Sequence, residues 1–256
     1  MGVKENTVNF LSADSVISQI VLALIICFLI WLVFWIIISS IVRVSSNESG
    51  KPWIIKTNWD AKRSMRLRQK GNNSTLLKRS SNEQGGIEFT YTIWLYVDDW
   101  NYNYNKWKHI FHKGNDDSWP GRAPGMWFHP NKNALRIYMN TFNNVAEYTD
   151  IFNIPMSKWF NVTMILKDSS INIYINGYLK RRMVLGGVPR QNWGDLHLCN
   201  NIGFSGFISR FRYYDYAIQF GELEHIINRG PSRDPCVGTN TQPPYLGPHW
   251  WQTRYI

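Results

Sequence analysis

Cysteine is scarce in this chain of 256 residues, and its scarcity excludes one way of stabilising a fold. Three cysteines, Cys27, Cys199 and Cys236, are too few for a disulfide-built scaffold. Cys27 lies in an apolar run, so Cys199 and Cys236 either pair with each other or remain free thiols. No group of Cys and His residues has the spacing of a zinc site, so a zinc-dependent fold is not expected either.

Acidic side chains are also in deficit, with 18 Asp and Glu against 28 Lys and Arg, which gives a net charge of +10. Such a charge suits an acidic protein, nucleic acid or an anionic membrane surface. No base-reading motif is present, so we expect no specific recognition of nucleic acid. No cofactor motif is present, and we expect no cofactor.

Polar side chains are absent between Ile20 and Ile38, which read IVLALIICFLIWLVFWIII. At 1.5 Å per residue this run is roughly 28 Å long as a helix, close to the thickness of a bilayer core. We therefore predict a short segment over 1–15 and one transmembrane helix within 16–44. A cleaved signal peptide is the alternative, but the run is long and no small-x-small cleavage site follows it.

The excess positive charge follows that helix, in residues 45–85, which we interpret as a basic juxtamembrane linker. By the positive-inside rule, the bulk of the chain then lies on the cytosolic side. The linker either contacts anionic lipid headgroups or an acidic partner, at about 1 kcal/mol per basic residue near the surface, or is simply solvated. The predicted contact residues are Lys62, Arg63, Arg66, Arg68, Lys70, Lys78 and Arg79.

Short alternating segments separated by turn residues fill residues 86–230. In INIYINGYLK, isoleucines 171, 173 and 175 alternate with polar residues, and Asn176-Gly177 accepts the positive φ angles of a tight type I′ turn. Many short strands at such spacing predict a mainly β, two-sheet antiparallel sandwich. The segment FGELEHIIN has helical spacing, and residues 231–256 read as a proline-rich tail. We expect its aromatic residues to dock on a partner or to pack on the domain: Trp250, Trp251 and Tyr255.

Three segments resemble a known fold family: FTYTIWLYVDDW at 89–100, KWFNVTMILKDSSINIYINGYLK at 158–180 and GFSGFISRFRYYDYAIQFGELEHIINRGPS at 203–232. In this order they look like a laminin G-like domain of the concanavalin A-like lectin/glucanase superfamily. The resemblance implies a jelly roll of two antiparallel sheets. A second resemblance, of the anchor, basic segment and domain together, is to membrane and virion proteins of large nucleocytoplasmic DNA viruses. It implies a minor capsid protein that links an internal membrane to the shell.

Catalytic patterns are missing. Hydrolases of the superfamily usually carry Glu-x-Asp-x-x-Glu on one strand face, and this chain has no such motif. Glu222 and Glu224 fall in the predicted helix, where a spacing of two points them apart. His109 and His112 are three apart on a predicted strand, so we expect them on opposite faces, unable to share a metal ion. We therefore expect a protein that is not an enzyme.

Two weaker binding sites remain. Carboxylate oxygens of the kind that calcium prefers lie in two adjacent pairs without a spaced ligand pattern, and such residues are common in loops anyway: Asp98, Asp99, Asp116 and Asp117. A sugar-stacking platform is the other candidate, while Trp107 and Trp127 are assigned to sheet packing. The platform residues are Trp100, Tyr102, Tyr104 and Trp119.

Three functions follow from these patterns. The first is a single-pass anchored scaffold that contacts structural proteins, including the viral capsid role. The second is a carbohydrate-binding receptor or attachment module, and the weakest is an anchored glycan hydrolase. Side of the membrane separates the first two, because a domain facing outward should carry sugar at Asn161 or in residues 45–85.

Overall fold

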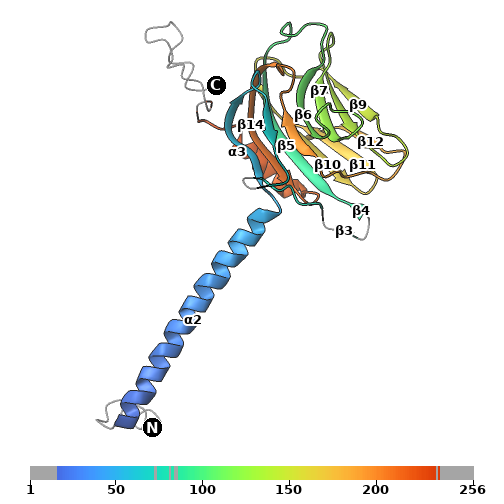
Figure 1. Cartoon of the computed structure of the whole chain (residues 1–256). Coiled ribbons are helices and arrows are strands. Elements are labelled where there is room, and N and C mark those ends of the chain that lie inside the picture. The colour runs from blue at the N-terminus through green and yellow to red at the C-terminus, as the bar shows by residue number, and fades with distance from the viewer. Residues whose placement is uncertain (1–15, 72–73, 81, 84–85, 235, 237–256) are drawn as a thin grey trace, which may run out of the picture. The chain divides into compact units, whose positions relative to one another are not determined.

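The computed structural model describes residues 16–71, 74–80, 82–83, 86–234 and 236 (Figure 1). The chain divides into two compact units, Met1–Ser49 and Gly50–Ile256. In the first unit, helix α2 spans Val16–Ser49, five residues beyond the predicted end. Its segment Gln19–Ser40 is long and apolar enough to cross a membrane, a test that a signal sequence near the N-terminus also passes.

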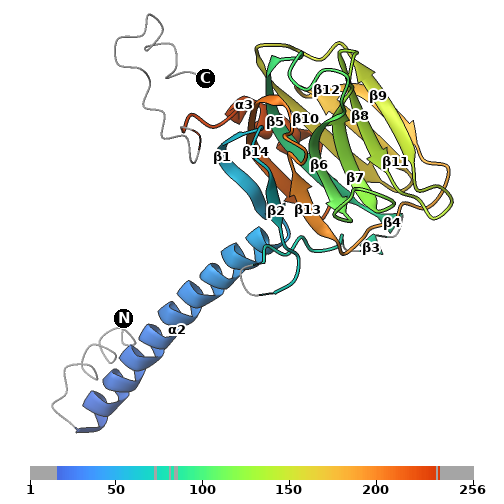
Figure 2. The ribbon, with the colours of Figure 1, turned by 45° about the horizontal axis from the view of Figure 1, so that its top comes forward.

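The second unit is built on two six-stranded sheets whose named strands all pair antiparallel. Sheet A has the order β1 (Trp53–Asp60), β14 (Ser205–Tyr214), β5 (Phe89–Asp99), β10 (Trp159–Lys167), β11 (Ser170–Ile175) and β12 (Tyr178–Val184). Sheet B, seen in Figure 2, has the order β2 (Met65–Leu67), β13 (Asp195–Leu198), β6 (Lys108–Gly114), β7 (Arg122–Phe128), β8 (Ala134–Met139) and β9 (Glu147–Phe152). A small ribbon joins β3 (Asn82–Glu83) to β4 (Gly86–Ile87). The predicted two-sheet sandwich is confirmed.

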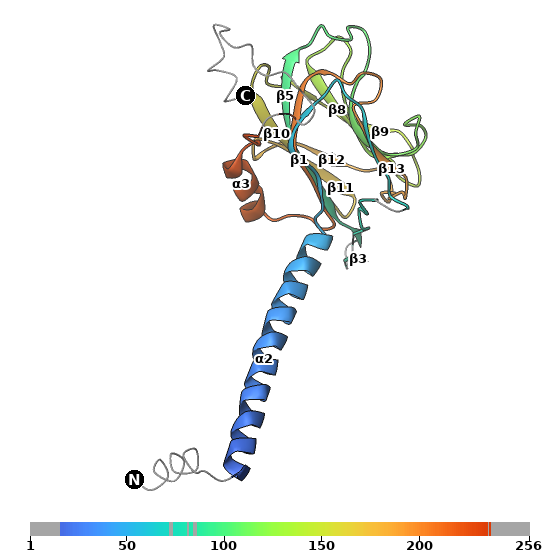
Figure 3. The ribbon, with the colours of Figure 1, turned by 60° about the vertical axis from the view of Figure 1, so that its left-hand side comes forward.

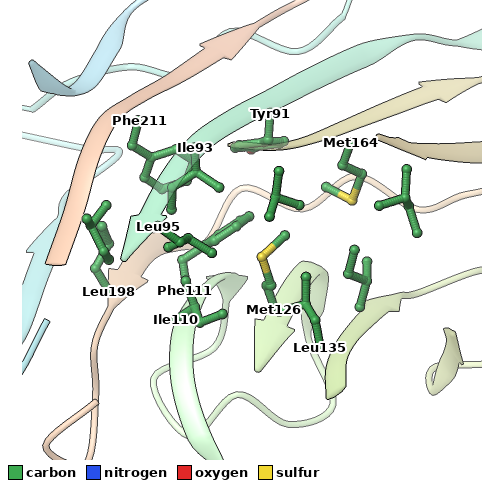
Figure 4. Close-up of a cluster of buried hydrophobic side chains, with 14 of the residues drawn as sticks. Tyr91, Ile93, Leu95, Ile110, Phe111, Met126, Leu135, Met164, Leu198 and Phe211 are labelled. Carbon is green, nitrogen blue, oxygen red and sulfur yellow. The ribbon is translucent and has the colours of Figure 1, made fainter. Parts of the chain in front are cut away.

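The core lies between the two sheets and consists of alternate side chains from facing strands (Figure 4). Tyr91 and Ile93 of β5 meet Phe111 of β6 and Met126 of β7, and all four are at most 2% exposed. Burial of one such side chain is worth about 1.5–3 kcal/mol. The hydrophobic effect of this core therefore holds the sheets together without a disulfide.

The predicted hairpin is confirmed in detail. Ile171, Ile173 and Ile175 are 0%, 0% and 6% exposed, so the isoleucine face is the buried face. Asn176 and Gly177 have φ angles of 50° and 83°, as a type I′ turn requires. The hairpin connects β11 to β12 at the edge of sheet A.

Helix α3 (Phe220–Arg229) covers part of the outer face of sheet A (Figure 3). Its Leu223 is 1% exposed and packs with Ile165 of β10, Tyr214 of β14 and Ile218. The helix predicted from FGELEHIIN is therefore present, and it forms a second, smaller hydrophobic cluster on the outside of the sandwich.

Residues 45–85 do not form a linker, which corrects the prediction. They contain strands β1 and β2, and β1 pairs with β14 across the register Ile55–Phe211. Ile54 and Ile55 are 8% and 6% exposed, so this segment contributes to the core. Of the predicted basic contact residues, Arg66 lies in β2 and the others lie exposed in turns and loops beside β1 and β2, and the partner strand of β1 is about 150 residues away in the sequence.

Asn161 is fully buried in β10, at the centre of sheet A. Its amide nitrogen donates to the Thr92 hydroxyl at 3.1 Å, and its side-chain oxygen accepts from the Thr163 hydroxyl at 2.7 Å. The expectation that an outward-facing domain would carry sugar at Asn161 is therefore wrong, because the folded sheet encloses this side chain.

Cys199 is a free thiol rather than half of a disulfide. It is fully buried, and burial raises the pKa of its thiol well above the usual value. The tail residues Trp250, Trp251 and Tyr255 lie outside the described residues, so their predicted docking stays a prediction.

Candidate functional site

A cavity of about 380 Å³ opens on the outer face of sheet B. The alternation of side chains along the strands creates it. Met126 and Phe128 of β7 point into the core, so Trp127 between them points outward, and Tyr138 of β8 does the same between Ile137 and Met139. The wall also includes Trp107, His109, His112 and Arg122.

Aromatic faces surround the guanidinium of Arg122. Its carbon lies 3.7 Å from the Tyr138 ring centroid, 5.5 Å from that of Trp127 and 5.2 Å from that of Trp119. Its Nε is buried and has no hydrogen-bond partner within the described part of the chain. Burial lowers the pKa of Arg122, although an arginine remains charged at any physiological pH. The site thus holds a fixed cation against flat apolar rings.

Gly125 makes room for one of those rings. A Cβ atom at this position would lie 2.3 Å from the ring edge of Trp127. Any larger residue would displace the indole that forms the floor of the cavity.

Two histidines form a hydrogen-bonded relay at the back of the cavity. The Asn200 amide donates to His109 Nδ1 at 2.8 Å, so His109 carries its proton on Nε2. His109 Nε2 lies 2.7 Å from His112 Nδ1, and His112 Nε2 lies 2.8 Å from the carbonyl oxygen of Asn115. Because the amide can only donate and the carbonyl can only accept, one tautomer of each neutral ring satisfies every bond.

Burial holds both rings neutral, against the hydrogen bond to the Asn115 carbonyl oxygen, which raises the pKa of His112. Burial lowers the pKa of His112 to about 4, and burial followed by the neighbouring His112 lowers the pKa of His109 well below its ordinary value. The ring of His197 stacks on His112 with centroids 4.7 Å apart, and burial lowers its pKa too. A proton added to either ring of the relay would place two N–H donors opposite each other, and the hydrogen bond between them would be lost.

The prediction that His109 and His112 lie on opposite faces is wrong. The pairing of β6 with β7 changes register between His109 and Phe111, and again between His112 and Gly114. Such a bulge adds a residue and returns the side chain at i+3 to the same face. The two rings therefore meet, but through a hydrogen bond rather than through a metal ion.

Asp116 and Asp117 lie at the rim of the cavity. Asp116 pairs with Arg66 at 3.0 Å and with His197 at 3.4 Å, while Arg66 also reaches Asp195 at 2.7 Å. No group of three or more His, Cys, Asp or Glu in the described ranges is arranged to hold a metal ion. Calcium binding at the predicted pairs, the second of which is Asp98 and Asp99 at the end of β5, stays untested.

The four predicted sugar platform residues lie outside the cavity lining. Trp100 packs on Phe128 with centroids 5.3 Å apart, and the Tyr102 hydroxyl donates to the Ile202 carbonyl oxygen. Tyr104 and Trp119 are exposed. Trp107 and Trp127, which we assigned to sheet packing, line the cavity instead. The sequence Met-Trp-Phe around Trp127 could have predicted this position, because strand alternation turns the indole away from the core when its two neighbours point into it.

The predicted basic contact residues that the structure describes lie on the surface of the sandwich. Lys62 lies over Tyr102 at 5.1 Å, Arg79 lies over Trp193 at 5.4 Å, and Arg66 is in ion pairs. Arg63 lies over Trp59, and Arg68, Lys70 and Lys78 are exposed. Contact of these residues with lipid stays a prediction.

Comparison with solved structures shows distant similarity to domains of botulinum neurotoxins. The ligand-binding domain of serotype D, solved in complex with N-acetylneuraminic acid, is 13% identical with a TM-score of 0.46, over 56% of this chain and 36% of that one. The serotype G binding domain is 18% identical with a TM-score of 0.47, over 65% and 42%. The serotype D receptor-binding domain is 14% identical with a TM-score of 0.47, over 69% and 45%. The chain thus spans less than half of each of these domains.

Among curated proteins, no sequence matches this chain. The family Laminin_G_3, described as the concanavalin A-like lectin/glucanases superfamily, matches residues 44–223. This range is more than half of the chain and includes both sheets from β1 to β14. The chain therefore belongs to the concanavalin A-like lectin/glucanases superfamily.

Proposed function

We propose that this chain is a membrane-anchored glycan-binding protein, with its binding site in the cavity of sheet B. The observation that carries the proposal is the combination of an open cavity of about 380 Å³, two indole rings and one phenol ring in its wall, and a fixed guanidinium. Ligand sites are typically clefts of this size, with apolar walls and a few placed polar groups.

The chemistry of the wall suits a sugar. The C–H face of a pyranose ring packs against Trp127, Trp107 or Tyr138, while its hydroxyl groups need hydrogen-bond partners. Arg122 supplies donors, and Asn200 and Asn201 at the rim supply side-chain amides. The neutral histidine relay adds no charge, so an uncharged sugar ring can approach without losing an ion pair.

We further propose that the site binds without cleaving. Glycosidases place an acid and a base or nucleophile about 5–10 Å apart on either side of the scissile bond. The carboxylates in the described lining are Asp116 and Asp117, which are adjacent in sequence, and Asp116 is engaged with Arg66. Incubation of the full chain with bound oligosaccharide should release no shorter product, and detection of a product would overturn this part of the proposal.

A second candidate, a scaffold between a membrane and other structural proteins, is favoured by the two edge strands β9 and β12. Large apolar side chains stand exposed there: Tyr148 is 51%, Phe152 58%, Tyr178 75% and Val184 70% exposed. Exposed apolar groups on sheet edges are typical of protein–protein contacts. In this proposal α2 lies in the internal membrane of a virion and the domain faces the capsid, on the cytosolic side.

A glycan array tests the first proposal with the full chain in detergent. We expect selective binding to a subset of glycans, and Trp107→Ala should abolish it. Trp193→Ala is the matched control, because Trp193 is also exposed and also lies against an arginine, Arg79, but on another part of the surface. Equal binding by both variants, or no binding by the parent chain, would reject the cavity as a glycan site.

Protease protection on membranes from cells separates the two candidates. Digestion of the sandwich from the cytosolic side would favour the scaffold, and cross-linking in particles would then identify its neighbours. Protection from cytosolic protease would favour an outward-facing glycan binder. Because Asn161 is enclosed by the sheet, a glycosylation shift at this residue is not a usable marker.

A further inference from the structure

A second cavity, of about 230 Å³, lies between α3 and the outer face of sheet A. Its lining is rich in cations, which come from the segment before β1, from β14 and from α3: Lys51, Arg210, Arg212 and Arg229. The carboxylate in this lining is Glu222. Four cations around one small cavity repel one another unless an anion joins them.

Glu222, the carboxylate in the described lining, forms no ion pair with the cations around it. Glu222 accepts a hydrogen bond from the Tyr216 hydroxyl at 2.8 Å, and no ion pair between Glu222 and a basic residue occurs in the described ranges. Burial lowers the pKa of Arg210 and the neighbouring charge of Arg229 lowers it further, while the carboxylate of Asp234 opposes this shift. In the described lining, Lys51, Arg210 and Arg229 outnumber the one carboxylate, so this part of the wall is positively charged at neutral pH.

An unused hydrogen-bond donor faces the same region. Trp94 of β5 lines the cavity and is 6% exposed, yet its indole N–H has no partner among the residues that the structure describes. A buried donor without a partner costs free energy, so such groups are rare unless a ligand or water satisfies them. An indole N–H can only donate, which requires an acceptor such as an oxyanion.

The walls of the cavity are held in place before any ligand binds. Arg210 donates to the carbonyl oxygens of Arg229 and Gly230, both at 3.0 Å, and so fastens the end of α3 to β14. Arg212 Nε donates to the Lys51 carbonyl oxygen at 2.9 Å, and its guanidinium lies 4.4 Å from the Trp53 ring centroid. A binding site with fixed side chains loses little conformational entropy when a ligand arrives.

We propose that this cavity binds a phosphate group. Several fixed cations and one neutral N–H donor match the oxygens of a phosphate monoester, and charge-assisted bonds from arginine to phosphate are among the strongest in proteins. Lys51 stands two residues after the end of α2 in the sequence. A membrane that holds α2 would supply phosphate headgroups at high effective concentration, whereas a soluble phosphate would bind without a membrane.

Titration of inorganic phosphate into the full chain tests the site, in a detergent that carries neither sugar nor phosphate. We expect saturable binding by calorimetry and a shift of the Trp94 indole N–H signal in nitrogen-15 spectra. Trp94→Phe should weaken binding about tenfold, because it removes one donor and keeps an aromatic ring. Trp100→Phe is the matched control, since its indole N–H is also buried without a partner but lies outside this cavity.

Charge is tested separately, because a tryptophan variant can alter packing. Arg229→Gln should also weaken phosphate binding, whereas Arg182→Gln on the exposed side of β12 should not, although both remove one positive charge. An equal loss in the two arginine variants would mean general electrostatic attraction only and would overturn the proposal. So would the absence of saturable binding, or equal affinity for acetate and phosphate.

A comparison of phosphatidic acid with inorganic phosphate distinguishes a lipid headgroup from a soluble phosphate ligand. Phosphatidic acid added to the same micelles should shift the Trp94 signal and compete with inorganic phosphate if the ligand is a lipid headgroup. A shift with inorganic phosphate alone would support a soluble phosphate ligand. No shift with either probe would overturn the site, while leaving the glycan proposal for sheet B untouched.

Discussion

The cavity of sheet B and the cavity beneath α3 lie on the two outer faces of one sandwich, and they differ in the balance of charge in their described linings. In the lining of sheet B, the cation of Arg122 shares the wall with the carboxylates of Asp116 and Asp117, and the neutral His109 and His112 bond to each other and to backbone groups. In the described lining on sheet A, basic residues outnumber carboxylates, and the carboxylate there, Glu222, is bonded to Tyr216.

This difference teaches how similar sheet surfaces come to suit different ligands. Strand alternation places a row of outward side chains on either sheet, but the neighbours decide whether charge remains. Where a cation and carboxylates share one wall, as Arg122, Asp116 and Asp117 do, the cavity suits a neutral molecule that can form hydrogen bonds with both. Where basic side chains outnumber carboxylates in the described lining, the cavity favours an anion.

Acid should have the largest effect, because protonation of His112 in the sheet B cavity lowers the stability of the folded chain. His112 has a pKa of about 4 in the folded chain and about 6.5 when unfolded, so the unfolded chain binds more protons between these values. Stability is therefore fully present above pH 6.5 and is lost as the pH falls to 4, by about 3 kcal/mol for this residue. Urea unfolding of the full chain at several pH values measures the loss.

A control isolates the histidine relay from the carboxylates that also titrate near pH 4. His112→Asn should flatten the slope of stability against pH between 6.5 and 4, whereas Trp193→Ala, a surface change that removes no titrating group, should leave it unchanged. If both variants keep the slope of the parent chain, protonation of the relay is not its cause.

The next largest effect is expected on ligand affinity, when one residue is replaced in each cavity in turn. Arg122→Gln should weaken glycan binding tenfold or more, since a hydrogen bond to a charged group is worth about 1.5–3 kcal/mol. The same variant should leave phosphate affinity unchanged, and Trp94→Phe should show the reverse pattern. Calorimetry of both variants with both ligands measures this, and a variant that lowers both affinities would show that the two faces are coupled.

Salt should lower phosphate affinity a few-fold and leave glycan affinity unchanged. Raising the ionic strength from about 0.05 to 0.5 M shortens the screening length several-fold, which weakens attraction between partly exposed charges. Phosphate affinity should fall accordingly, while glycan affinity should hold, because its ligand is uncharged. A parallel fall of both would argue that the ligand of sheet B is itself an anion.

The smallest effect is expected at the rim of sheet B. Arg66 and Asp116 are both exposed, and exposed ion pairs contribute little to stability. Arg66→Ala should leave the midpoint of thermal unfolding unchanged within error. A clear drop would mean that the contact with Asp195, which is less exposed, holds β2 to β13.

The parts of this fold that the sequence predicts are those that depend on near neighbours. The hairpin of Ile171, Ile173 and Ile175 needs only strand alternation and the turn residues Asn176-Gly177, so all of its features were readable. Helix α3 and the apolar segment of α2 were predicted for the same reason. Each is encoded within about twenty residues of continuous sequence.

The parts that were missed depend on residues far away. The bulge that brings His109 to His112 arises from pairing with β7, and β1 is a strand because β14 lies beside it. Trp107 and Trp127 were assigned to packing because aromatic residues usually are buried, and only the position of sheet B reveals the cavity. The cation cluster was hidden because its members come from residues 51, 210–212 and 229.

The buried amide of Asn161 has a consequence for how this chain is made. In a ribosome-bound, extended chain, Asn161 is followed by Val162 and Thr163 and has the pattern that a glycosylating enzyme accepts in the secretory pathway. A sugar attached there would replace the bonds to Thr92 and Thr163 and would fill the space of the neighbouring strands. Such a chain could not close sheet A, so every folded copy descends from a nascent chain that kept this asparagine bare.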